Sequence, residues 1–145
     1  MVTFISHSPE ETAAIGERWG REVRAGLVIA LRGDLGSGKT QFVRGLARGL
    51  GFTGRVHSPT FTLVNEYVGG RLTLLHLDLY RLETAEALGS AGLEEFLSPD
   101  GVTVIEWAER LDATGFATPD ANWRHITFET LGDNERRIVH DDPGS

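Results

Sequence analysis

The segment 27–40 reads Leu-Val-Ile-Ala-Leu-Arg-Gly-Asp-Leu-Gly-Ser-Gly-Lys-Thr, and it decides the fold. Its first five residues, Leu27–Leu31, are all apolar, which is typical of a strand buried on both faces in a parallel sheet. Residues Gly33–Thr40 match the phosphate-loop pattern G-x-x-x-x-G-K-S/T at every fixed position. A helix is expected over Thr40–Leu50, ending at Gly51. Strand, glycine-rich loop and helix in this order predict a phosphate-binding α/β fold.

The residue types of this loop predict how it binds a nucleotide. Glycines permit backbone angles that let the chain close around an anion, and successive amides then point at the β-phosphate. The positive end of the following helix adds to this attraction. Lys39, the only lysine beside 13 arginines, is expected to bridge the β- and γ-phosphates, and the Thr40 hydroxyl to bind Mg²⁺. The expected ATP contacts of the loop are Gly33, Asp34, Leu35, Gly36, Ser37, Gly38, Lys39 and Thr40.

Two further apolar runs end in an acidic residue. Asp78 follows Leu74–Leu77, and Glu106 follows Val102–Ile105. Ligands bind at the carboxyl ends of parallel strands in open α/β sheets. Either acid therefore reaches the loop if its strand runs parallel to Leu27–Leu31, and either could hold magnesium or orient water. The alternative for each is a solvent-exposed acid at a strand end. His76, two residues before Asp78, is expected to be a packing or hydrogen-bonding residue.

The rest of the chain predicts one domain, residues 1–145, with a mixed, mostly parallel sheet that carries helices on both faces. Ser8 is the expected N-cap of a helix from Pro9 to about Arg24, whose apolar face is Ala14, Ile15, Trp19 and Val23. One or two short helices are expected within Thr84–Leu97. The other expected strands are Val2–Ser6, Phe61–Tyr67, Leu72–Leu79, Val102–Ile105, and a hairpin of Arg124–Thr130 and Arg136–His140 around Gly132-Asp133-Asn134.

Composition excludes several classes of protein. The chain has no cysteine and a formal net charge of −7, and no apolar run approaches the roughly 20 residues of a membrane helix. Direct strong binding to nucleic acid is not expected of so acidic a chain. Without a recognisable signal peptide, a cytoplasmic location is expected. The guanine-reading motif Asn-Lys-x-Asp and the transporter motif Leu-Ser-Gly-Gly-Gln are both missing from the sequence.

Five motifs in order resemble one family. They are Gly33–Thr40, then Phe42-Val43-Arg44-Gly45-Leu46, then Ser58–Tyr67, then His76-Leu77-Asp78-Leu79-Tyr80-Arg81-Leu82, and Val104-Ile105-Glu106-Trp107-Ala108-Glu109-Arg110-Leu111. The chain is similar to the TsaE (YjeE) family of bacterial tRNA threonylcarbamoyladenosine (t6A) biosynthesis. The resemblance implies a slow Mg-dependent ATPase that acts on the TsaB–TsaD pair, which modifies adenosine 37 of tRNAs reading ANN codons.

The same resemblance implies roles for individual residues. Thr40 and Glu106 look like magnesium ligands, and Asp78 is similar to a Walker-B-like acid. Ser58, Pro59, Thr60 and Phe61 resemble a nucleotide-sensing switch, although a plain turn before a strand explains them equally well. Thr12 resembles a contact to adenine or ribose, Gln41 stands where an α-phosphate contact is found, and Trp107 is expected near the nucleotide. The resemblance assigns no firm role to Arg136 or Arg137.

Two other functions compete with a regulatory ATPase. A small-molecule or nucleoside kinase needs an arginine-bearing lid, but Thr84–Asp100 contains no arginine. A non-catalytic nucleotide-binding module needs Lys39 but neither Asp78 nor Glu106. In the ATPase interpretation, the candidate catalytic residues are Lys39, Asp78 and Glu106, and either acid could orient or activate the attacking water. The chain offers no evident arginine finger, so turnover by the isolated protein should be slow.

Overall fold

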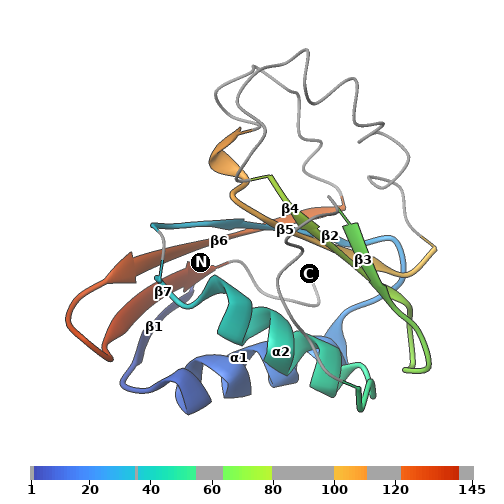
Figure 1. The fold of residues 1–145 in the computed structure, drawn as a ribbon, viewed down its shortest axis with the longest axis horizontal. Coiled ribbons are helices and arrows are strands. Elements are labelled where there is room, and N and C mark those ends of the chain that lie inside the picture. Colours follow the sequence, from blue (N-terminus) through green and yellow to red (C-terminus); the bar gives the residue numbers. More distant parts are fainter. Residues whose placement is uncertain (1, 35, 55–63, 80–99, 111–121, 141–145) are drawn as a thin grey trace.

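Seven strands form one sheet in the computed structural model, which describes residues 2–34, 36–54, 64–79, 100–110 and 122–140 (Figure 1). The strand order is β1-β7-β6-β2-β5-β4-β3. The elements are β1 (Val2–Ser6), α1 (Pro9–Glu22), β2 (Val28–Arg32), α2 (Lys39–Gly49), β3 (Val64–Tyr67), β4 (Leu74–Asp78), β5 (Val102–Glu106), β6 (Trp123–Thr130) and β7 (Arg136–His140).

The centre of the sheet is parallel and its edges are antiparallel. Strands β4, β5, β2 and β6 run parallel to one another, whereas β3, β7 and β1 pair antiparallel with their neighbours. Both the predicted mixed sheet and the predicted β6–β7 hairpin are confirmed. In the register of the ladder Glu106 lies beside Leu31 on one side and beside Asp78 on the other. The two predicted acids therefore reach the same edge of the sheet, where β2 enters the phosphate loop.

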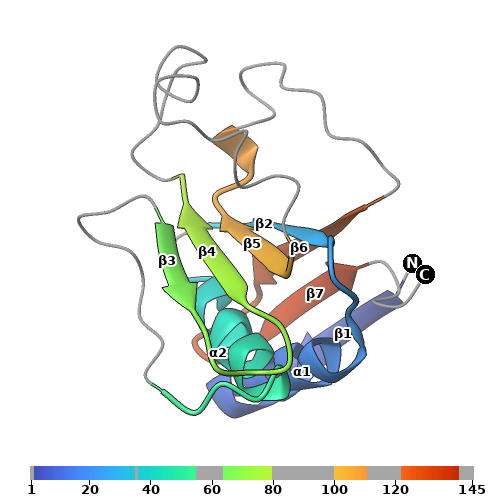
Figure 2. The same cartoon turned by 90° about the vertical axis from the view of Figure 1, so that its right-hand side faces the viewer.

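Both described helices lie on one face of the sheet (Figure 2). They pack against Ile29, Leu31, Val104 and Ile126, which belong to the larger apolar cluster. The opposite face carries a second cluster that includes Val28, Ala30, Leu77, Ile105 and Trp123. Helices were predicted on both faces of the sheet, and the short helices predicted within Thr84–Leu97 lie outside the described residues. No helix in the described part of the chain is long and apolar enough to cross a bilayer.

The start of α1 follows its predicted pattern, and its buried face differs from the prediction at one residue. Ser8 is the N-cap, and its Oγ accepts the Glu11 N–H at 3.1 Å. Ile15, Trp19 and Val23 are buried, but Ala14 is exposed. At 3.6 residues per turn Ala14 points roughly 180° away from the centre of the buried stripe, so its apolar character alone was misleading.

Glycines bring the two helices unusually close. A Cβ added at Gly45 would lie 1.8 Å from the Ala13 carbonyl oxygen, and one at Gly16 would lie 2.1 Å from the Phe42 carbonyl oxygen. Gly20 and Gly49 have similarly close neighbours on the facing helix. Since only glycine permits these contacts, α2 is held rigidly against α1, and the phosphate loop at its N-terminus is held with it.

Gly45→Ala is therefore expected to destabilise the protein by about 2–3 kcal/mol, because overpacking outweighs the gain of about 1 kcal/mol in helix propensity. Urea unfolding measures this change. Arg44→Ala is the control, since Arg44 is the exposed preceding residue of the same helix. A Gly45→Ala variant as stable as the parent would contradict this account of the helix contact.

Candidate nucleotide-binding site

The N-terminus of α2 differs from that of α1 in the way that an anion site requires. Helix α1 has a serine cap and two acids, Glu10 and Glu11, in its first turn. Helix α2 has Gly38 as its N-cap and no acid in its first turn. Glycine offers no side-chain acceptor to the first amides, and no carboxylate offsets the positive end of the helix dipole. The N-terminus of α2 is thus suited to receive a negative group from outside the helix.

The loop before α2 owes its shape to three glycines with positive φ. Gly33, Gly36 and Gly38 have φ values of 147°, 78° and 103°. At Gly33 an added Cβ would lie 2.7 Å from the Phe128 carbonyl oxygen and from Ser37 Oγ. A larger residue at these positions would strain the backbone or collide with its neighbours, as the sequence pattern predicts.

Lys39 is almost completely covered, with 5% of its surface exposed. Its Nζ donates to the Gly33 carbonyl oxygen at 2.5 Å and lies 3.5 Å from the centre of the Trp107 ring. Burial lowers the pKa of Lys39 below its usual 10.5, whereas the negative charges of Glu109, Glu106, Asp78 and Asp34 act to raise it. The Lys39 amine is thus held within the loop among acidic side chains.

Each carboxylate oxygen of Glu106 has a hydrogen-bond partner. The Thr40 hydroxyl donates to Glu106 Oε1 at 3.1 Å, and His76 Nε2 lies 2.5 Å from Glu106 Oε2. His76 is fully buried and Glu106 is 3% exposed. The hydrogen-bonding role predicted for His76 is confirmed. With an ionised Glu106, Nε2 is the protonated nitrogen, which orients the carboxylate with Oε1 toward the loop.

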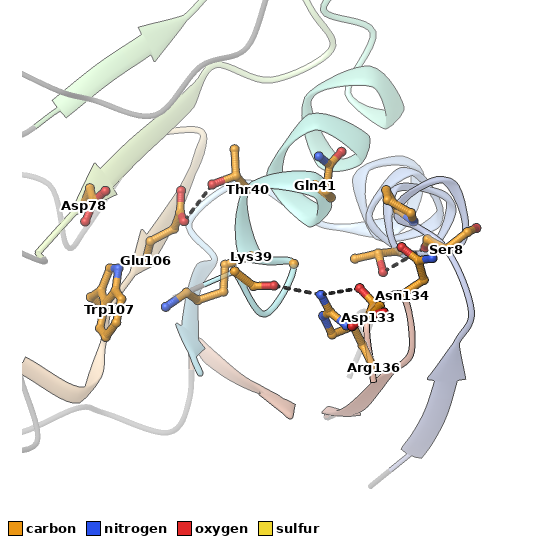
Figure 3. A pocket seen from close by; sticks show the side chains of 14 residues that line it. Ser8, Lys39, Thr40, Gln41, Asp78, Glu106, Trp107, Asp133, Asn134 and Arg136 are labelled. Atoms are coloured by element: carbon orange, nitrogen blue, oxygen red, sulfur yellow. Dashed lines mark hydrogen bonds between the residues drawn. The ribbon is translucent and has the colours of Figure 1, made fainter. Parts of the chain in front are cut away.

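One cleft of about 320 Å³ collects these groups, a volume within the range of small-molecule sites. Figure 3 shows Asp78, Glu106 and Trp107 on one side of Lys39 and Thr40, and Ser8, Asp133, Asn134 and Arg136 on the other. The predicted site residues that line the cleft are Thr12, Gly36, Gly38, Lys39, Thr40, Gln41, Asp78, Glu106 and Trp107.

The other predicted residues fall into two groups. Gly33, Asp34 and Ser37 belong to the loop but do not line the cleft. Leu35 and the predicted switch Ser58–Phe61 lie outside the described residues. Thr12, which does line the cleft, is itself largely buried, and its hydroxyl oxygen lies 2.7 Å from Ser6 Oγ.

Sequence reasoning missed the far wall of the cleft. Ser8 and Pro9 come from the start of α1, and Asp133 and Asn134 from the turn between β6 and β7. The sequence predicted both segments as a cap and a turn, and neither contained a signal for ligand binding.

Arg136 joins the far wall to the phosphate loop. Its guanidinium donates to the carbonyl oxygen of Gly36 at 3.0 Å and to the carbonyl oxygens of Gly132 and Glu135 at 2.7 and 2.9 Å. Arg137 instead pairs with Glu129 across the hairpin, at 2.8 Å. The two adjacent arginines, which the sequence did not distinguish, thus have different roles: Arg136 connects two parts of the site, and Arg137 lies on the surface.

The donor set of the cleft suits a magnesium-bound polyphosphate. Among the described residues no group of three or more His, Asp or Glu side chains could enclose a metal by itself. Mg²⁺ usually takes one or two protein oxygens and completes its shell with phosphate and water. The Thr40 hydroxyl and the Glu106 carboxylate offer such a partial set, next to a lysine and an uncapped helix N-terminus.

Comparisons with known proteins agree on one family. Residues 6–138 match the family model described as threonylcarbamoyl adenosine biosynthesis protein TsaE. The tRNA threonylcarbamoyladenosine biosynthesis protein TsaE of Bacillus subtilis is 41% identical over 91% of this chain and 80% of its own. The protein of the same name from Treponema pallidum is 48% identical over 93% and 96% of the two chains. The crystal structure of Bacillus subtilis YdiB superposes with a TM-score of 0.79 at 35% identity, over 96% of this chain and 83% of that one.

Proposed function

The chain belongs to the TsaE family of tRNA threonylcarbamoyladenosine biosynthesis proteins, and from this premise we propose that it is the Mg-dependent ATPase that drives turnover of a TsaB–TsaD complex. ATP is the substrate, and ADP and phosphate are the products. The observation that carries the proposal is the cleft in which the Lys39 amine, the N-terminus of α2 and the Thr40–Glu106 pair meet. Each of these groups has a part in phosphoryl transfer to water.

Lys39 and the loop amides bind the triphosphate in this proposal. The Lys39 amine leaves the Gly33 carbonyl oxygen, 2.5 Å away, to contact the β- and γ-phosphates. Only a small movement is needed, since the amine already lies inside the loop. Charge that develops on the transferring phosphoryl group is then stabilised by a cation in a site largely shielded from water.

The two acids, Glu106 and Asp78, have separate proposed roles in hydrolysis. Glu106 shares a hydrogen bond with Thr40 and is oriented by His76, so Thr40 and Glu106 are the residues that would hold a magnesium ion. Bound magnesium would neutralise charge on the β- and γ-phosphate oxygens. Asp78 lines the same cleft from the neighbouring strand and orients the attacking water.

Phosphate release with and without TsaB–TsaD tests the proposal. We expect slow hydrolysis by the isolated chain and at least tenfold faster hydrolysis with the partners, because the guanidinium of Arg136, the arginine in the described wall of the cleft, is engaged with backbone carbonyls. An arginine finger supplied by a partner typically accelerates such reactions by at least a thousandfold. Equal kcat values under the two conditions would count against a partner-dependent ATPase. A pull-down with and without ATP shows whether the nucleotide controls assembly.

The kinase alternative predicts a different product. A kinase transfers the γ-phosphoryl group to a second molecule, so labelled phosphate would appear on a nucleoside or metabolite and not in solution. Thin-layer separation of products from γ-labelled ATP distinguishes the two functions. We expect free phosphate as the only labelled product.

His76→Leu tests the proposed orientation of Glu106. Loss of a partner that orients a metal ligand typically weakens metal binding by about 10–100-fold. We therefore expect the Mg²⁺ concentration for half-maximal hydrolysis to rise about tenfold or more, with a smaller change in His76→Gln, which keeps a donor. His125→Leu is the matched control, because His125 contacts Arg32 and does not line the cleft. An unchanged Mg²⁺ dependence in His76→Leu would show that Glu106 needs no such support.

A further inference from the structure

Consecutive residues at and after the end of β5 contact the phosphate loop and the end of β2. This segment, Glu106–Glu109, is called the β5 turn below. Its contacts are Glu106 Oε1 with Thr40 Oγ1 at 3.1 Å, the Trp107 ring with Lys39 Nζ at 3.5 Å, the Ala108 N–H with the Leu31 carbonyl oxygen at 3.0 Å, and Glu109 Oε2 with the Gly33 N–H at 2.7 Å. The first two contacts involve groups of the site already described. The last contact has no counterpart in the proposed function.

Glu109 holds the first residue of the phosphate loop. Its carboxylate accepts the Gly33 N–H, while the Gly33 carbonyl oxygen accepts the Lys39 amine. The polar groups on either side of the Gly33 Cα are therefore both engaged, one by Glu109 and one by Lys39. Gly33 itself has φ 147° and close neighbours in Phe128 and Ser37. A shift of this residue would move the carbonyl that orients the Lys39 amine.

The backbone of the β5 turn brings Glu109 to this position. Trp107 has φ 62° and is the one non-glycine residue with positive φ among those the structure describes. Such a conformation is costly for a tryptophan and persists only where the surrounding contacts maintain it. Here the ring packs over Lys39 and the next residue, Ala108, bonds to Leu31. The chain thereby turns back so that Glu109 lies over the start of the loop.

Glu109 contacts the phosphate loop and lies outside the lining of the cleft. It is half-buried and does not line the cleft, which separates it from Asp78 and Glu106. Its second oxygen, Oε1, is buried and has no hydrogen-bond partner within the described part of the chain. A buried carboxylate oxygen of this kind is costly. The contact that Glu109 does make, to Gly33, therefore calls for a function.

We propose that Glu109 is a positioning residue for the phosphate loop: by accepting the Gly33 N–H, it fixes the backbone of Gly33, and with it the carbonyl oxygen that holds the Lys39 amine inside the loop before ATP binds. This inference rests on the proposed ATP binding of the same cleft. It assigns to Glu109 neither proton transfer nor contact with the metal. The proposed role depends on an acceptor at the right distance from the Gly33 N–H, and not on the effect of the Glu109 charge on the Lys39 amine.

Three substitutions at Glu109 distinguish the position of the hydrogen-bond acceptor from its negative charge. Glu109→Gln keeps an acceptor at the same distance and removes the charge. Glu109→Asp keeps the charge and withdraws the acceptor by one methylene. Glu109→Ala removes both. Isothermal titration with Mg-ATP should show affinity within about threefold of the parent for Gln, and up to about tenfold weaker affinity for Asp and Ala, as loss of one hydrogen bond implies. Thermal unfolding reports whether each variant is folded.

Two of the possible results would overturn this inference. Parent-like affinity of the Asp or Ala variant overturns the inference, and so does a folded Gln variant as weak as Asp. If the Ala variant does not fold, the contrast between Gln and Asp still decides. Glu66→Ala is the control for loss of an acid, because Glu66 is exposed on β3 away from the cleft. Should Lys39→Ala abolish binding while Glu109→Ala does not, only the inference about Glu109 fails; should Lys39→Ala also bind, the proposed function fails first.

Discussion

Lys39→Ala is expected to remove measurable Mg-ATP binding. Hydrogen bonds between charged groups contribute about 1.5–3 kcal/mol each, and the amine is proposed to contact two phosphates. The loss is therefore about 3 kcal/mol or more, at least a hundredfold in affinity. Lys39 is the only lysine of the chain, so no other lysine side chain can replace it. Isothermal titration calorimetry with Mg-ATP measures the change.

Lys39→Arg is expected to fail as well, although it keeps the positive charge. The amine lies 3.5 Å from the Trp107 ring with 5% of the residue exposed, and the planar guanidinium is larger than this space. Arg48→Ala is the matched control: it removes an exposed cation from the same helix, nine residues beyond Lys39 and outside the cleft. Full binding by Lys39→Ala, with the control unchanged, would mean that the loop does not bind the triphosphate.

Glu106→Gln is expected to lower the rate of ATP hydrolysis by about a hundredfold, the scale of losing one electrostatic contact in a preorganised site. Glutamine has nearly the same shape and can still bond to Thr40 and His76, which lie 3.1 and 2.5 Å from the two carboxylate oxygens. The change therefore removes the charge that holds magnesium and leaves the packing intact. Phosphate release over a Mg²⁺ titration is the measurement, with ATP binding in EDTA as the control for the loop.

Asp78→Asn distinguishes the two acids. Asp78 lies beside Glu106 in the ladder but is proposed to orient water, so its substitution should lower kcat without changing the Mg²⁺ dependence. A shifted Mg²⁺ dependence in Asp78→Asn and a normal one in Glu106→Gln would reverse the assignment. Unchanged hydrolysis in both variants would favour a non-catalytic nucleotide-binding module.

Local patterns in the sequence were enough to predict the strand–loop–helix unit at Leu27–Leu50, the cap at Ser8 and the β6–β7 hairpin. Each depends on residues a few positions apart: glycines for positive φ, a serine for the first amides of a helix, and an apolar run for a buried strand. The prediction that Ala14 belongs to the buried face was wrong, because it relied on the apolar character of the residue and not on the direction in which position 14 points on the helix. The resemblance to the TsaE family was based on the order of five motifs, and the comparisons confirm that family.

By itself the sequence determined the phosphate loop and the acids at two strand ends, because these signals are contained in single short segments. Only the tertiary structure decided which distant residues meet there. Thr40 and Glu106 are 66 positions apart, Gly33 and Glu109 are 76 apart, and Gly36 and Arg136 are 100 apart. Strand order and register set these contacts, and both arise from the packing of the whole sheet. No local pattern encodes that packing. The contact of Glu109 with Gly33, the far wall of the cleft and the different contacts of Arg136 and Arg137 therefore became visible only in the folded chain.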